Sequence, residues 1–143
     1  TIIMQLNSVN PKMSYSLHDC REIANEFMQG KSEAGNKIIE GYASIHKSKV
    51  PSKVFGQNYL TRLFDDLGAE GVVKHYGNEK NVMAEIIQSA YKKFQQGYAA
   101  PHFTTNLMPH ELATYYDPRV LDRINEMCNI IIFPQAPSRR LLL

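Results

Sequence analysis

Residues 59–68, YLTRLFDDLG, carry the signal that decides the fold. The run Tyr59–Phe64 is rich in apolar side chains, has the length of a strand, and stops abruptly at Asp65 and Asp66. It predicts a buried strand with two acids at its carboxyl end. Adjacent carboxylates repel each other, and a bound divalent cation gives such a pair a use. A strand that runs into an acidic turn without a ligand is the alternative interpretation of these residues.

Downstream of this strand, a glycine-containing loop leads to a predicted helix from Asn81 to Gln96. Gly97 supplies the stop for this helix. Its apolar residues recur at the spacing of one helical face: Val82, Met83, Ile86, Ile87, Ala90, Tyr91 and Phe94. Four further elements are expected after it, in this order: a strand at His102–Thr105, a helix at Pro109–Tyr115, a helix from its N-cap Asp117 to about Met127, and a strand at Asn129–Phe133.

The first part of the chain is less regular. A short, partly aromatic segment, Ser14–Asp19, precedes a predicted helix over Cys20–Gln29, with Asp19 as its cap and Gly30 as its end. Between residues 31 and 58, glycine, proline, lysine and serine predict mainly connecting structure, with a short helix around Ile38–Tyr42. Strands that alternate with helices indicate one α/β domain over residues 1–143, with a mainly parallel sheet that binds ligands at the carboxyl ends of its strands.

Composition limits the function classes. The chain has 143 residues, of which 43% are hydrophobic and 21% are charged, as expected for one compact domain. Its net charge of +2 argues against a dedicated nucleic-acid-binding domain. The two cysteines and five histidines show no metal-ligand spacing. The sequence contains neither an apolar run of about 20 residues nor a signal-peptide pattern, so we expect a cytoplasmic protein without a membrane partner.

Three further groups of polar residues follow predicted strands or flank a predicted helix. Asn106 ends the segment Thr104–Thr105–Asn106, where a neutral amide can orient a water or touch a phosphate oxygen. Arg119 and Arg123 lie four residues apart on one helix flank. Residues 138–140, Ser-Arg-Arg, follow the last predicted strand. Taken singly, each has a plain structural interpretation: a turn cap, a solvated pair and a charged terminus.

Taken together, these features resemble a known family. The series FDDLGAE, YGNEKNVMAEII, HFTTNL, YYDPRVLDRINEMCN and SRR is similar to the DnaC-like helicase loaders and the related ATPases that assist transposition, which are AAA+ P-loop ATPases. The resemblance covers residues 59–140. It implies a three-layer P-loop core with a Walker B strand, a sensor 1 strand, an arginine-finger helix and a sensor 2 arginine in this order.

The resemblance implies a role for each site residue. Asp65 would organise Mg²⁺, and Asp66 would stand at the catalytic-acid position, where many relatives have Glu; Glu70 is a nearby candidate to compensate for the shorter side chain. Asn106 would be sensor 1. The remaining implied roles concern nucleotide contacts: Arg123 as the finger inserted toward a neighbour's γ-phosphate, Arg119 as its support, Arg140 as sensor 2 with Arg139 as the alternative, and Thr1 in the place of the magnesium-binding hydroxyl.

The sequence contains no GxxxxGK[ST] phosphate loop. Residues 1–6, TIIMQL, look like the continuation of a P-loop helix, so we expect the natural protein to extend upstream and this chain to lack the first strand and the phosphate loop. Without them, the chain by itself is expected to bind ATP poorly.

The resemblance implies an ATPase that binds ATP and Mg²⁺ at sites between subunits of a ring or filament. Its implied partners are a replicative helicase or a transposase, and single-stranded DNA. Two alternatives remain open at this point: a nucleotide-dependent interaction protein that does not hydrolyse ATP, and a P-loop ATPase of another class.

Overall fold

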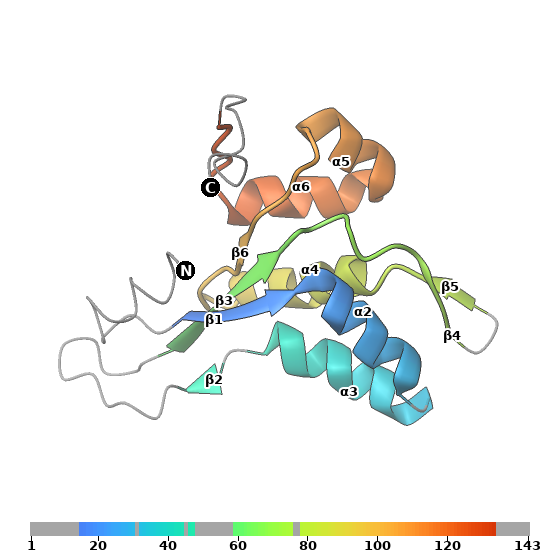
Figure 1. Cartoon of the computed structure of the whole chain (residues 1–143). Coiled ribbons are helices and arrows are strands. Elements are labelled where there is room, and N and C mark those ends of the chain that lie inside the picture. The colour runs from blue at the N-terminus through green and yellow to red at the C-terminus, as the bar shows by residue number, and fades with distance from the viewer. Residues whose placement is uncertain (1–14, 31, 45, 48–58, 76–77, 134–143) are drawn as a thin grey trace, which may run out of the picture.

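The computed structural model of the chain describes residues 15–30, 32–44, 46–47, 59–75 and 78–133, and Figure 1 shows how its elements are arranged. The fold is α/β, with a small parallel sheet and five helices in these residues. In the view of Figure 1, helices α2 and α3 lie below the strands and α5 and α6 above them, with α4 between the two groups. The parallel α/β architecture predicted from the sequence is confirmed.

Strand β3 (Tyr59–Asp65) holds the sheet together, because each of the other strands of this sheet pairs with it. Strand β1 (Tyr15–Asp19) runs parallel to it, with Asp19 opposite Asp65. Strand β6 (His102–Phe103) is also parallel, and places Phe103 opposite Phe64. The short β2 (His46–Lys47) pairs antiparallel with the start of β3. The carboxyl ends of β1, β3 and β6 therefore meet at one edge of the sheet.

Five helices in the described residues surround the sheet, and the N-caps that the sequence predicts at Asp19 and Asp117 are confirmed. They are α2 (Cys20–Gln29), α3 (Ser32–Ala43), α4 (Val82–Phe94), α5 (Pro109–Tyr115) and α6 (Pro118–Met127). The side chain of Asp19 caps α2, that of Asn81 caps α4 and that of Asp117 caps α6, each by accepting a backbone N–H. Local sequence chemistry thus sets where α2, α4 and α6 begin.

The hydrophobic core lies between strand β3 and the helices, and Phe64 is fully buried in it. The Phe64 ring stacks on Phe103 of β6, with the ring centroids 5.6 Å apart. Helix α4 supplies the largest share of buried side chains, namely Val82, Met83, Ile86, Ile87 and Ala90. These residues belong to the apolar face that the sequence predicts for this helix, which is confirmed.

Two sequence predictions are wrong in this part of the molecule. Residues 32–43 form the regular helix α3 instead of mainly connecting structure, with Gly35 and Gly41 inside it. Glycine disfavours a helix by about 1 kcal/mol relative to alanine, and packing against α4, which buries Ile39 and Ala43, outweighs that cost. A two-stranded hairpin, β4 (Val73–His75) and β5 (Asn78–Lys80), also replaces part of the expected loop before α4.

The expected strand at Asn129–Phe133 is likewise wrong. These residues are described without regular structure, and the four side chains from Ile130 to Phe133 are 52–82% exposed. A run of β-branched residues becomes a strand only when a neighbour accepts and donates its backbone hydrogen bonds. No strand in the described residues pairs with this segment.

A buried arginine, which no sequence pattern singles out, fastens α3 to the sheet. Arg62 lies within β3 and is 9% exposed. Its guanidinium donates to the carbonyl oxygens of Gly41, at 2.7 Å, and Ser44, at 3.1 Å, and also contacts His18 of β1. A cation is favourable beside the carbonyl end of a helix, which carries partial negative charge.

No helix in the described part of the chain combines the length and apolar character needed to cross a bilayer.

We expect Arg62→Met to lower the free energy of unfolding by about 2 kcal/mol or more, because two carbonyl groups lose their donors. Equilibrium unfolding in urea, followed by circular dichroism, measures this change. The matched control Lys92→Met removes an exposed cation from α4, and should change the stability by less than about 0.5 kcal/mol. Equal stability of the two variants would show that the contacts of Arg62 contribute nothing.

Candidate functional site

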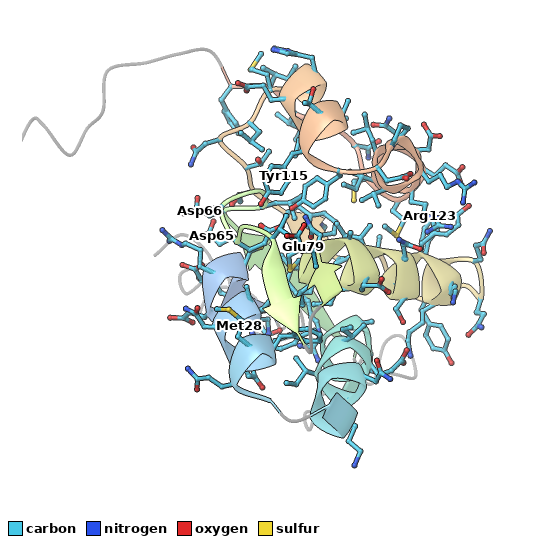
Figure 2. The ribbon with its side chains drawn as sticks, turned by 90° about the vertical axis from the view of Figure 1, so that its right-hand side faces the viewer. Met28, Asp65, Asp66, Glu79, Tyr115 and Arg123 are labelled. Atoms are coloured by element: carbon cyan, nitrogen blue, oxygen red, sulfur yellow. The ribbon has the colours of Figure 1, made fainter. Side chains whose placement is uncertain are left out.

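The acidic pair lies in a tight turn at the carboxyl end of β3 (Figure 2). Asp65 is the last residue of the strand, and Asp66 follows with a φ of 58°, in the left-handed region. Asp and Asn tolerate that region better than other residues that carry a side chain. Gly68, with a φ of 95°, continues the turn. The backbone therefore reverses directly after Asp65 and presents both carboxylates at the edge of the sheet.

Thr104, directly after β6, holds this turn by backbone and side-chain hydrogen bonds. Its N–H donates to the Phe64 carbonyl at 2.9 Å, and its own carbonyl accepts the Leu67 N–H at 2.8 Å. The Thr104 hydroxyl donates to the Asp65 carboxylate and accepts the Asp66 N–H, the latter at 3.1 Å. Thr104 thus orients both members of the acidic pair, although the sequence predicts a role only for Asn106, two residues later.

Asn106 reaches the acidic pair, as the sequence predicts from the order of the strands. Its side-chain amide donates to Oδ1 of Asp66, with 3.3 Å between the heavy atoms. The preceding residue, Thr105, joins the same two segments: its hydroxyl donates to the Leu67 carbonyl at 2.6 Å and accepts the Leu107 N–H at 3.1 Å. The structure therefore brings Asp65, Asp66 and Asn106 together at the carboxyl ends of two neighbouring parallel strands.

Arg21 is a fourth member of the site that sequence reasoning missed. Its Nη2 lies 2.7 Å from Oδ2 of Asp19 and 3.2 Å from Oδ2 of Asp66. The hydrogen bond from Arg21 lowers the pKa of the Asp19 carboxyl. The site thus holds the three carboxylates of Asp19, Asp65 and Asp66 beside one guanidinium. Arg21 reaches Asp66 because of the register of β1 against β3, and the periodicity of the sequence does not reveal that register.

Glu70 does not lie where it could take over the role of Asp66. It is 8% exposed, and its carboxylate accepts the Gly68 N–H at 2.8 Å and the hydroxyl of Tyr116. Both oxygens are therefore engaged inside the protein. The expectation that this longer acid compensates for Asp66 does not agree with this arrangement.

The predicted finger, Arg123 of α6, lies apart from the acidic pair of the same chain. Arg119 is exposed, and Arg123 places its guanidinium over the ring of Tyr91 on α4, 5.4 Å from the ring centroid. The Nη1 atom of Arg123 is buried without a hydrogen-bond partner. Figure 2 shows Arg123 on the opposite side of the view from Asp65 and Asp66. Within one chain, the structure thus separates the predicted finger from the acids.

The remaining candidate residues lie outside the described part of the chain. Thr1, Arg139 and Arg140 belong to the terminal segments 1–14 and 134–143. Their predicted nucleotide contacts stay predictions.

The donor set at the turn suits Mg²⁺ that arrives with a phosphate ligand. Magnesium in proteins takes one or two carboxylates, keeps several waters, and shares oxygens of a substrate phosphate. Asp65 and Asp66 supply that number of carboxylates, and Thr104 and Asn106 orient them. In the described residues, no three His, Cys, Asp or Glu side chains gather so as to hold a metal ion by themselves. The pair fits a shared site rather than a closed metal cage.

Comparison with known proteins adds no family assignment: no protein-family model, curated protein or solved structure matches the chain.

We expect Thr104→Val to lower the free energy of unfolding by about 1–2 kcal/mol, because the Asp65 carboxylate loses a donor and the Asp66 N–H loses its acceptor. Thr104→Ser, which keeps the hydroxyl, is the matched control and should lose less. Urea unfolding of both variants measures the difference. If valine and serine give the same stability, the hydroxyl does not hold the acidic turn.

Proposed function

We propose that this chain is part of an AAA+ P-loop ATPase of the helicase-loader type, with ATP sites formed between subunits. The observation that carries the proposal is the meeting of Asp65, Asp66 and Asn106 at the carboxyl ends of β3 and β6. This edge of a parallel sheet is where α/β proteins bind ligands. The order of motifs along the chain supports the particular family.

Each residue has a defined task in this proposal. Asp65 binds the magnesium hydration shell, and Asp66 accepts a hydrogen bond from the water that attacks the γ-phosphate. The Asn106 amide donates to that water or to a γ-phosphate oxygen without adding charge. Mg²⁺ supplies charge neutralisation of the phosphates. Thr1, as a magnesium-binding hydroxyl, and Arg140 or Arg139, as a cation on the subunit's own nucleotide, complete the proposed set.

The position of Arg123 supports a site shared between subunits. Its guanidinium faces Tyr91, away from the acids of its own chain, so in this proposal another copy supplies the arginine that reaches the phosphate. A cation delivered in this way stabilises the charge that develops on the transferred phosphoryl group. Arg119, four residues earlier on α6, supports Arg123 in this role. The chain then self-associates into a ring or filament, acts on a replicative helicase or a transposase, and responds to single-stranded DNA.

A nucleotide switch without turnover is a second candidate, and two contacts of Asp66 favour it. The Asp66 carboxylate is paired with Arg21 at 3.2 Å and receives the Asn106 amide at 3.3 Å. Both carboxylate oxygens of Asp66 are then engaged by side chains of the protein, and these contacts compete with a hydrogen bond from an attacking water. In this alternative, ATP binding drives assembly, and Asp66 serves as a structural anchor for the turn.

We expect Arg123→Ala to abolish ATP hydrolysis in the full-length gene product that contains these residues, because a neighbour's site loses its cation. Specific activity of the parent should rise with protein concentration. Mixing Arg123→Ala with Asp66→Asn should restore part of the activity, because one mixed interface combines an intact acid with an intact arginine. Lys92→Ala, which removes an exposed cation from α4, is the control and should keep full activity. Activity that survives Arg123→Ala would refute the shared site.

Asp66→Asn separates hydrolysis from switching. Asparagine tolerates the left-handed backbone at this position, so the fold and ATP binding should persist. If the protein is an ATPase, we expect the rate of turnover to fall by at least about 100-fold, because a single general base typically contributes about 100- to 10,000-fold to the rate. Steady-state phosphate release and fluorescent-nucleotide binding measure the two properties. Unchanged DNA- or partner-dependent activity in this variant would instead favour the switch.

A further inference from the structure

A buried acid connects the acidic turn with the helix that carries Arg119 and Arg123. The Glu70 side chain is 8% exposed, and both of its oxygens accept hydrogen bonds. Oε2 accepts the Gly68 N–H at 2.8 Å, and Oε1 accepts the Tyr116 hydroxyl. Hydrogen bonds to an ionised carboxylate are about twice as strong as neutral ones. Glu70 therefore joins two segments that are far apart in the sequence.

At one end, this connection fixes the turn of Asp65 and Asp66. Gly68 has a φ of 95°, and a Cβ atom at this position would lie 2.4 Å from Cδ1 of Leu107. The glycine backbone thus packs against the residue that follows Asn106. Glu70 accepts the Gly68 N–H and so holds the turn in place. The turn then packs against the segment after β6, whose residues Thr104 and Asn106 contact the acids.

At the other end, the connection fixes the corner between α5 and α6. Tyr116 is 3% exposed, ends α5 with an N–H bond to the Leu112 carbonyl, and directly precedes Asp117, the N-cap of α6. Burial, with the nearby Glu70 charge, raises the pKa of the Tyr116 hydroxyl, which therefore stays protonated and donates. The start of α6 is thus tied to a carboxylate in the acidic turn.

We propose that Glu70 and Tyr116 are positioning residues that set the acidic turn relative to the start of α6, so that cation binding by Asp65 and Asp66 depends on the Tyr116 hydroxyl. This inference rests on the proposed function, because it takes the acidic pair as the cation site. Neither residue touches the cation. The partners that orient metal-binding side chains typically change metal affinity by about 10- to 100-fold when they are lost.

The test is the affinity of the whole chain for Mn²⁺, used as a spectroscopic substitute for Mg²⁺ and measured from the electron paramagnetic resonance signal of the free ion. We expect Tyr116→Phe and Glu70→Ala to weaken Mn²⁺ binding by about tenfold. Glu70→Gln should retain most of the affinity, because its amide oxygen still accepts the Gly68 N–H and its amino group can donate to Tyr116. All titrations are run at temperatures where urea unfolding shows each variant to be folded.

Tyr115→Phe is the matched control, because the buried Tyr115 hydroxyl lies near Glu70 but makes no hydrogen bond to its carboxylate. It should leave Mn²⁺ affinity unchanged. Equal affinities of Tyr116→Phe and Tyr115→Phe would overturn the positioning role.

A second measurement separates this inference from the proposed function. If Asp65→Asn leaves the Mn²⁺ affinity of the chain unchanged, the acidic pair is not a cation site and the proposed function fails. Hydrogen exchange of the Gly68 and Val120 amides in Tyr116→Phe then tests the connection between the turn and α6 independently of cation binding. Faster exchange at both amides, relative to Tyr115→Phe, supports the connection between the turn and α6, and unchanged exchange overturns it.

Discussion

The hydrogen bonding of β3 is the constraint on which the rest of this structure depends. β1, β2 and β6 all pair with this strand, so its position fixes the edge at which polar groups gather. Two of its residues hold other elements: Phe64 anchors the core, and Arg62 binds the carbonyl end of α3. Asp65 then ends the strand at the point where β1 and β6 also end. A change in the register of β3 would separate these groups from their partners.

The backbone at the acidic turn explains why the second acid is an aspartate. At a φ of 58°, residues other than glycine, asparagine and aspartate pay about 1–2 kcal/mol. Aspartate also has the reach to meet the Asn106 amide and the Arg21 guanidinium at 3.2–3.3 Å. A glutamate would gain one methylene of reach at the expense of that backbone preference. Local geometry is thus a physical reason for an aspartate, instead of a glutamate, at position 66.

Charge compensation and hydrogen bonding around the turn combine near neighbours in the sequence with residues that lie far apart in it. Arg21 stands between Asp19 and Asp66, and the buried Glu70 is satisfied by neutral donors, the Gly68 N–H and the Tyr116 hydroxyl. Buried charges are costly unless their hydrogen-bonding capacity is met. The arrangement therefore keeps the carboxylates of Asp65 and Asp66 at the surface of the turn while the adjoining acid is enclosed. It links the geometry of the turn to α6.

The sequence by itself determined the helices α2, α4, α5 and α6, the strand β3 and the meeting of Asp65 and Asp66 with Asn106, because caps, helical periodicity and the order of parallel strands are local signals. Only the tertiary structure decided the rest. Packing against α4 made α3 a helix despite its glycines, and the lack of a pairing strand in the described residues left Asn129–Phe133 without regular structure. The contacts of Arg21, Arg62 and Glu70 depend on strand register and on side chains brought together over long sequence separations, which no local pattern encodes.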